Sequence, residues 1–116
     1  MAIVLSPKSL VHVVLISFRK GASPDDRQWA SSALQRLGKA CGGESAGILF
    51  WQVSDNLDQR KNWHLVEFAI FRENEALQQF RIHPAHVEVS ERLRAFADWA
   101  IGDFETASSV DGGLLG

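Results

Sequence analysis

The histidines are the side chains of this sequence best suited to chemistry near neutral pH. Three of them, His12, His64 and His86, occupy positions where the surrounding pattern predicts an apolar residue. An imidazole titrates near neutral pH, so it can take a proton from a carbon next to a carbonyl group. One hypothesis is therefore a small-molecule cavity in which His86 is the candidate base, while His12 and His64 hold the oxygens of the substrate.

Other interpretations of the same histidines stay open at this point. A partly buried imidazole bonded to a backbone carbonyl or to water is the commoner state of a single histidine. The three could also be ligands of a zinc ion, but no His-x-His pattern supports this and we expect no metal and no organic cofactor. His83 precedes Pro84 and is expected to cap or orient the following helix beside the site.

Strand and helix patterns alternate along the segments that must position these histidines. The sequence Ser23-Pro24-Asp25-Asp26 predicts the start of a helix that ends at Gly42-Gly43. Asn74 is expected to cap a short helix, which Pro84 interrupts before a second helical stretch to Ala97. Runs rich in β-branched and aromatic residues predict strands over residues 10–18, 47–53, 63–71 and 97–105.

The resulting order, β-α-β-β-α-β, predicts an α+β fold of the ferredoxin-like type, with helices on one face of a four-stranded antiparallel sheet. The first and third predicted strands are apolar on both faces, and the helices of one chain can cover only one of them. We therefore predict a homodimer that closes into a dimeric α/β barrel. The expected interface residues are Val11, Val13, Leu15, Trp63, Leu65 and Glu67.

Composition places the chain among ordinary globular domains. Its 116 residues are 46% hydrophobic and 22% charged, which fits one domain, expected over residues 9–107 between an extension (1–8) and a flexible tail (108–116). A net charge of −2 without a basic stripe argues against nucleic acid as a partner. The lone Cys41 favours a cytoplasmic location, and the short apolar run at residues 2–5 predicts neither a signal peptide nor a membrane anchor.

Three segments resemble the stress-responsive A/B barrel (Dabb) family: Val11-His12-Val13-Val14, residues 63–68 (WHLVEF) and residues 80–87 (FRIHPAHV). The resemblance implies a dimeric α/β barrel. In a plant polyketide-shaping cyclase of that family, the residue matching His86 is the catalytic base and those matching His12 and His64 line the cavity. That cyclase has a tyrosine at the position of Phe80, and this chain contains no tyrosine. Phe80 is thus expected at the substrate but cannot donate a hydrogen bond.

The expected role is that of a Dabb-domain protein that binds a small molecule in a histidine-lined cavity. One alternative is a cofactor-independent cyclase or isomerase that uses His86 as its general base. Another is a non-catalytic, stress-associated structural protein. A cofactor-free monooxygenase on a related barrel is a further alternative, although the sequence carries no motif that distinguishes it.

Overall fold

A computed structural model describes residues 8–106 of the chain, so the predicted tail and nearly all of the N-terminal extension lie outside the described residues. Its strands match the predicted ones closely. The first and last strands along the chain have the predicted bounds, the second covers residues 48–55 instead of 47–53, and the third begins two residues later than expected. A short 3-10 helix, η1, was not expected. The elements are β1 (Leu10–Phe18), α1 (Pro24–Ala40), η1 (Gly43–Ala46), β2 (Ile48–Asp55), β3 (Leu65–Phe71), α2 (Asn74–Ile82), α3 (Pro84–Arg94) and β4 (Ala97–Glu105).

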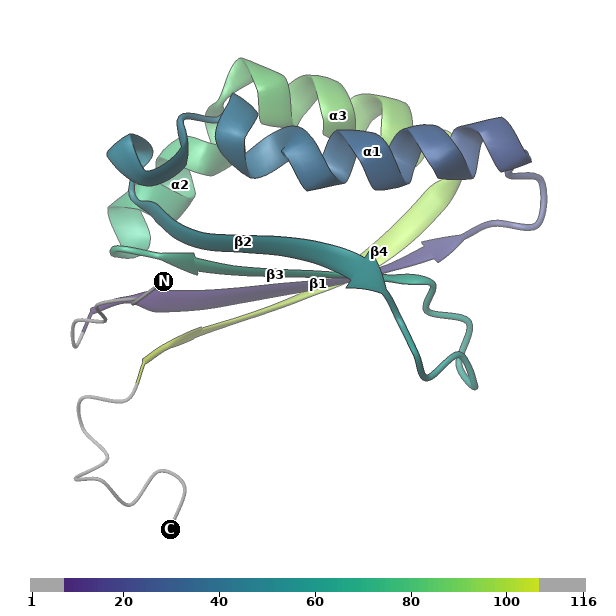
Figure 1. Cartoon of the computed structure of the whole chain (residues 1–116), viewed down its shortest axis with the longest axis horizontal. Coiled ribbons are helices and arrows are strands. Elements are labelled where there is room, and N and C mark those ends of the chain that lie inside the picture. The colour runs from purple at the N-terminus through teal and green to yellow at the C-terminus, as the bar shows by residue number, and fades with distance from the viewer. Residues whose placement is uncertain (1–7, 107–116) are drawn as a thin grey trace, which may run out of the picture.

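The four strands form one antiparallel sheet in the order β2-β3-β1-β4. All three α-helices lie on the same face of this sheet, and no helix of residues 8–106 lies on the other face (Figure 1). This is the predicted ferredoxin-like arrangement, with β1 and β3 in the centre and β2 and β4 at the edges. Within residues 8–106, no helix has the length and apolar character needed to cross a membrane.

Local sequence signals account for where the helices begin. The hydroxyl of Ser23 accepts a hydrogen bond from the backbone N–H of Asp26 at 3.0 Å, and the Asp26 carboxylate accepts one from the N–H of Ser23 at 3.2 Å. This reciprocal pair is a capping box. Pro84 separates α2 from α3 because His83 before it is held in an extended conformation. The expected cap of α2 is wrong: Glu73, not Asn74, occupies that position, and its side chain makes no capping hydrogen bond.

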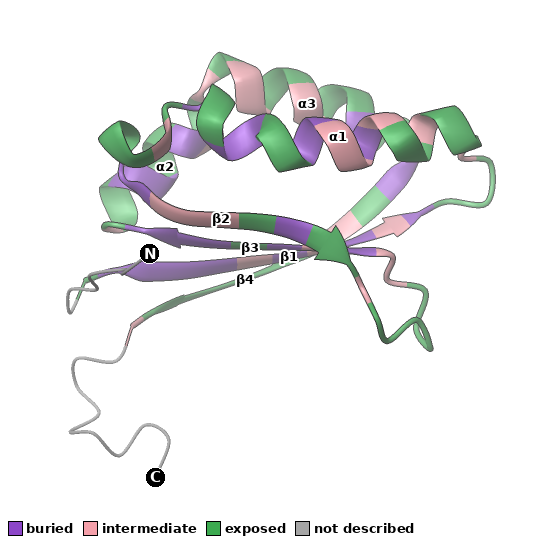
Figure 2. Cartoon of the chain, in the orientation of Figure 1, coloured by how far each residue is buried: buried purple, intermediate pink, exposed green. Residues whose placement is uncertain are grey.

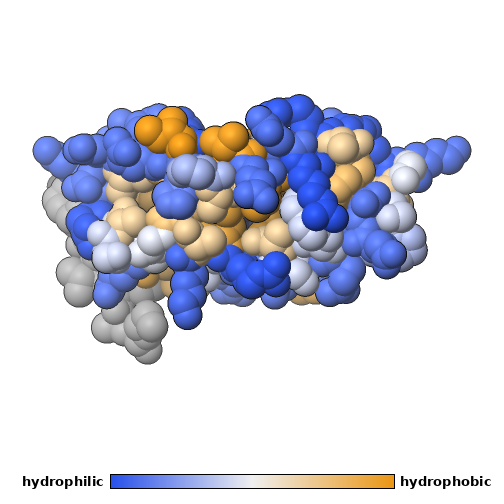
Figure 3. All heavy atoms as spheres, turned by 90° about the horizontal axis from the view of Figure 1, so that it is seen from above, coloured by the Kyte–Doolittle hydropathy of each residue, from blue (hydrophilic) through white to orange (hydrophobic). Residues whose placement is uncertain are grey.

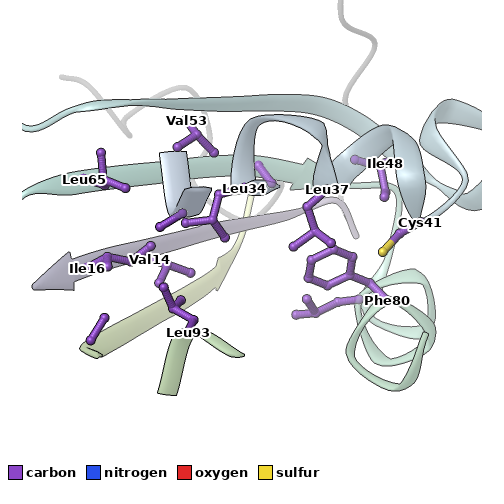
Figure 4. Packing of buried hydrophobic residues seen from close by; sticks show 14 of the residues in the cluster. Val14, Ile16, Leu34, Leu37, Cys41, Ile48, Val53, Leu65, Phe80 and Leu93 are labelled. Carbon is purple, nitrogen blue, oxygen red and sulfur yellow. The ribbon is translucent and has the colours of Figure 1, made fainter. Parts of the chain in front are cut away.

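The hydrophobic core lies between the helices and the sheet. Leu34 and Leu37 of α1 and Leu93 of α3 point toward Val14 and Ile16 of β1 (Figure 4). Buried residues follow the inward sides of the helices and the central strands (Figure 2). Seen from the helix side, hydrophilic residues prevail on the surface, with hydrophobic residues among them (Figure 3). The helices therefore bury one face and expose the other to solvent.

The strand register corrects two of the expected interface residues. Ile16 pairs with Leu65 and Val14 pairs with Glu67, so these two residues of β3 lie on the helix-covered face. Leu65 is buried in the same core as Ile16 (Figure 4). Their expected place on the uncovered face is wrong, because alternation defines two faces but not which face of β3 matches which face of β1. The residues of β3 on the uncovered face are Val66, Phe68 and Ile70.

The uncovered face of the sheet is nevertheless apolar. Val11, Val13 and Leu15 lie on it as expected, on the opposite side of β1 from Val14 and Ile16. The rings of Phe50 and Phe68 meet edge to face on the same side, with centroids 5.8 Å apart. Trp63, the remaining expected interface residue, lies in the loop ahead of β3. Its backbone carbonyl accepts a hydrogen bond from the Asn56 side chain at 2.9 Å.

The contact between α1 and β2 provides a test of the packing. A Cβ atom added at Gly38 would lie 2.5 Å from Cγ of Trp51, whose indole N–H donates to the carbonyl of Leu34 at 2.9 Å. Overpacking of a buried site costs about 1–3 kcal/mol. Alanine favours a helix over glycine by about 1 kcal/mol, so we expect Gly38→Ala to lower the free energy of unfolding by up to about 2 kcal/mol in urea titrations.

The matched control is Gly21→Ala, since nothing lies within 4 Å of a Cβ at that position. Gly21→Ala is expected to change stability little. A Gly38→Ala protein as stable as the wild type would contradict the seating of Trp51 on α1.

Candidate functional site

His12 lies buried in the middle of the sheet, between two carboxylates. Its side chain projects from the central strand β1 and the residue is only 3% exposed. Nδ1 lies 2.5 Å from Oδ1 of Asp103, the residue paired with His12 on β4. Nε2 lies 3.4 Å from Oε2 of Glu67 on β3, which is 4% exposed. Three adjacent strands therefore each contribute one ionisable side chain to a cluster in which His12 and Glu67 are buried and Asp103 is partly exposed.

The surroundings of His12 favour its protonated form. Burial by itself lowers the pKa of His12, but hydrogen bonds to Glu67 and Asp103, together with the charges of both carboxylates, outweigh burial and raise that pKa above its ordinary value of 6.5. Asp103 also accepts a hydrogen bond from Nη2 of Arg81 at 2.8 Å. A protonated His12 thus completes a row of alternating charges that runs from Glu67 to Arg81.

His86 has the opposite character. It lies in the first turns of α3, and its Nδ1 is 3.0 Å from the backbone carbonyl of Arg81. A carbonyl can only accept, so Nδ1 carries the hydrogen and the lone pair of the neutral ring resides on Nε2. Burial lowers the pKa of His86 below its ordinary value. At pH 7 this histidine is therefore neutral and has one nitrogen able to accept a proton.

The two imidazoles line a common cavity of about 40 Å³ between the sheet and the helices. Its polar lining consists of His12, Glu67, His86 and Ser90. The space is of the order of one or two water molecules. Apolar side chains from α1, α3, β1 and β4 form its other walls: Val14, Ile16, Leu34, Leu37, Val89, Leu93, Trp99 and Ile101.

A larger groove adjoins this cavity on the side of the edge strand. The α3–β4 groove has a volume of about 420 Å³ and shares His86, Ser90, Trp99 and Ile101 with the cavity. Its remaining lining is Arg81, Val87, Glu91 and Arg94. His86 therefore lies at the boundary between a small buried space and a groove large enough for a small molecule.

Phe80 and His83 support this site without lining the cavity. The Phe80 ring is buried, with its centroid 4.6 Å from the ring of His86 and 6.1 Å from the ring of His12. It packs behind both imidazoles, whereas the sequence placed it at the substrate. His83 accepts a hydrogen bond from the N–H of Ala85 at 3.1 Å through its Nδ1, so it caps α3 and orients the turn that carries His86.

His64 does not join the other two histidines, and this expectation from the sequence is wrong. Its ring stacks on Phe18 with centroids 5.4 Å apart, and its Nδ1 accepts a hydrogen bond from the Phe18 N–H at 2.9 Å. Its backbone N–H donates to the carbonyl of Ile16. Since His12 lies four residues from Ile16 on the same strand, the two sites are separated by about 13 Å along β1. His64 lines a different groove with Arg27 and Asp55.

The separation of His64 also removes the three-histidine arrangement that a zinc site would have needed. Among residues 8–106, no three or more His, Cys, Asp or Glu side chains come close enough together to hold a metal ion.

Sequence reasoning missed Asp103 and Ser90, and it assigned Glu67 to the wrong face. Asp103 could have been found, because it follows Trp99 and Ile101 on the alternating inward row of the predicted final strand. A carboxylate that follows apolar residues on the row facing the core needs a partner, and the partner is His12. Ser90 carries no comparable signal, since a serine on a helix is ordinary.

Solved structures with the same fold are numerous but distant in sequence. A dimeric ferredoxin-like protein of unknown function from Thermobifida fusca has a TM-score of 0.76 at 14% identity, covering 90% of this chain and 97% of that one. The hydroxynitrile lyase from Passiflora edulis has a TM-score of 0.74 at 11% identity and covers 90% and 98%. SnoaB, a cofactor-independent oxygenase from Streptomyces nogalater, has a TM-score of 0.67 at 16% identity and covers 90% and 98%. These likenesses establish the fold.

No curated protein matches the sequence. The model of the stress responsive A/B barrel domain, in contrast, matches residues 10–106, which span all four strands and the three α-helices of the described structure. The match includes both cavity histidines and the two carboxylates that hold His12. The chain belongs to the stress responsive A/B barrel (Dabb) domain family.

Proposed function

We propose that the cavity and the adjoining α3–β4 groove together bind a small carbonyl compound, and that His86 removes a proton from the carbon next to its carbonyl group. The observation that carries this proposal is the pair of imidazoles on one cavity whose surroundings shift their pKa values in opposite directions. When the pKa values of two neighbouring groups are shifted apart, the group with the lower pKa can accept a proton while the other stays protonated. His86 is the base, and His12 is the protonated partner.

The step conserves all atoms and electrons within the substrate and the two histidines. The C–H bond breaks as a new N–H bond forms at Nε2 of His86, and the electron pair moves to the carbonyl oxygen, which becomes an enolate oxygen. His86 then returns the proton to another atom of the substrate, which gives an isomerisation. If the enolate carbon instead attacks a second carbonyl group of the substrate, a C–C bond forms, the C=O π bond of that group breaks and its oxygen takes the proton from His86, which closes a ring.

His12 is the group that can stabilise the enolate oxygen. The hydrogen bond from its Nε2 to Glu67 is long, at 3.4 Å, compared with the ordinary N–H···O distance of about 2.7–3.2 Å. The Nε2–H can therefore be shared with a substrate oxygen in the cavity, while Asp103 fixes the other side of the ring. Phe80 cannot donate a hydrogen bond to the enolate oxygen. In its place, the protonated His12 would donate the hydrogen bond that stabilises the negative charge on that oxygen.

The fold is compatible with catalysis, since both a hydroxynitrile lyase and a cofactor-independent oxygenase have it. The proposed proton transfer likewise uses only side chains of this chain. The competing role, a non-catalytic binding protein, gives the opposite result in the exchange experiment below.

We also propose that a second copy of the chain covers the uncovered face of the sheet. Val11, Val13 and Leu15 on β1 and Phe68 on β3 make this face apolar, and Phe68 is 36% exposed. Apolar surface that the helices of the same chain leave uncovered is typical of contact sites between subunits. A two-fold axis would place two such faces together, and the similar protein from Thermobifida fusca is described as dimeric.

The base is tested by proton exchange into a simple ketone. In D₂O at pH 7, we expect the wild-type protein to accelerate exchange of the acetyl protons of 4-hydroxyacetophenone, followed by ¹H NMR. General-base catalysis contributes about 10²–10⁴-fold, so His86→Ala should lose about 10²-fold of the acceleration. The matched control is His64→Ala, which removes a histidine that lies outside the cavity and should retain the activity. Equal rates in wild type and His86→Ala would contradict the proposal.

The dimer is tested by placing a charge on the uncovered face. We expect the wild type to be a dimer at micromolar concentration in sedimentation velocity experiments, and Phe68→Glu to be a folded monomer. An unpaired carboxylate buried between two sheets is strongly unfavourable, whereas the partly exposed position tolerates it in one chain. The control is Leu57→Glu, at a loop residue that is 97% exposed, which should remain dimeric. A monomeric wild type would refute the proposal.

A further inference from the structure

The α3–β4 groove must hold most of any substrate that reaches His86. The buried cavity has room for little more than the reacting group, whereas the groove is about ten times larger and shares His86 and Ser90 with it. A ligand with its carbonyl group at Nε2 of His86 therefore extends outward between α3 and β4. The chemistry of the groove then indicates the class of ligand.

The middle of the groove is apolar. Val87 contributes from α3 and is 41% exposed, while Ile101 contributes from β4 and is 51% exposed. Trp99, two residues before Ile101 on the same inward row, adds an aromatic surface. Exposed apolar side chains on both walls of a groove favour a ligand with a flat apolar body.

One arginine at the groove is available for an anion. Arg81 is already paired with Asp103, at 2.8 Å. Arg94, in contrast, makes no ion pair within residues 8–106, and its guanidinium carbon lies 5.7 Å from the ring centre of Trp99. A guanidinium held against an aromatic ring keeps its donors for a carboxylate, which it can bind with two parallel hydrogen bonds. Glu91 also lines the groove and would repel such a ligand.

We infer that the ligand of this site is an aromatic keto acid. Its carbonyl group reaches His86, its ring lies on Val87, Trp99 and Ile101, and its carboxylate binds Arg94. This inference rests on the proposed function for the position of the carbonyl group, but the preference for an acid depends on the charges of Arg94 and Glu91 and not on His86. Binding and proton exchange can therefore be measured separately.

The test compares 4-acetylbenzoate with its neutral counterpart 4-acetylbenzamide. Binding to the full chain is followed through the indole N–H signal of Trp99 in NMR titrations, assigned with a Trp99→Phe protein. We expect the acid to bind about threefold more tightly than the amide, the effect of one exposed ion pair. Equal affinities, or no binding of either probe, would overturn the inference.

Two substitutions on α3 should change this preference in opposite directions. Arg94→Gln is expected to abolish the preference for the acid over the amide. Glu91→Gln is expected to increase that preference about twofold, because it removes a negative charge that repels the carboxylate of the ligand. The matched control is Arg92→Gln, because Arg92 lies over Trp29 at 4.0 Å and does not line the groove. A preference for the acid that survives Arg94→Gln would contradict the role of this arginine.

The two proposals fail in different ways. A wild-type protein that prefers the acid but does not accelerate exchange of the acetyl protons would refute the base role of His86 and support the carboxylate site. Exchange that is equally fast for both probes, with equal affinities, would support the base and refute the carboxylate site. His86→Ala is expected to lose the exchange and keep the preference for the acid.

Discussion

The burial of His12 between Glu67 and Asp103 is the constraint on which the rest of this structure depends. Ionisable groups removed from water are costly unless they are paired, and removing one member of such a set leaves an uncompensated charge. The pairing requires β3, β1 and β4 to lie side by side in one register, since each strand supplies one member. Through Asp103 it extends to Arg81 and so connects the sheet to α2.

The same constraint explains why a polar cavity exists inside an otherwise apolar core. Leucines from α1 and α3 fill most of the space between the helices and the sheet. They cannot pack directly on His12 and Glu67, because buried polar groups need hydrogen-bonding partners that a leucine does not offer. His86 occupies the opposite wall because Pro84 starts a new helix there and His83 caps it. The carbonyl of Arg81 then determines which nitrogen of His86 faces the substrate. Arg81 thus contacts one histidine through its backbone and the other through Asp103.

The elements of the fold could be predicted from the sequence because their signals are local. The capping box at Ser23, the proline at position 84 and the β-branched run of β1 each act within a few residues. The site depended on register, which is not local: an offset of one residue between β1 and β3 exchanged the faces of Leu65 and Glu67. The prediction that His64 lies at the same cavity was wrong for a related reason. His64 precedes β3, and its backbone bonds to Ile16, four residues along β1 from His12. His12 and His86 line one cavity between the sheet and the helices, and the rows on which they lie are defined by apolar neighbours on the same strand or helix.

The central claim, that one cavity divides its two histidines into a protonated and a neutral member, is tested most directly by an NMR pH titration of the imidazole nitrogens in the full chain. The carboxylates around His12 raise its pKa and burial lowers that of His86, so His12 should titrate above 6.5 and His86 below 6.5. Between the two pKa values His12 is charged while Nε2 of His86 can accept a proton. Titration of His12 below 6.5, or of His86 above His12, would contradict the account.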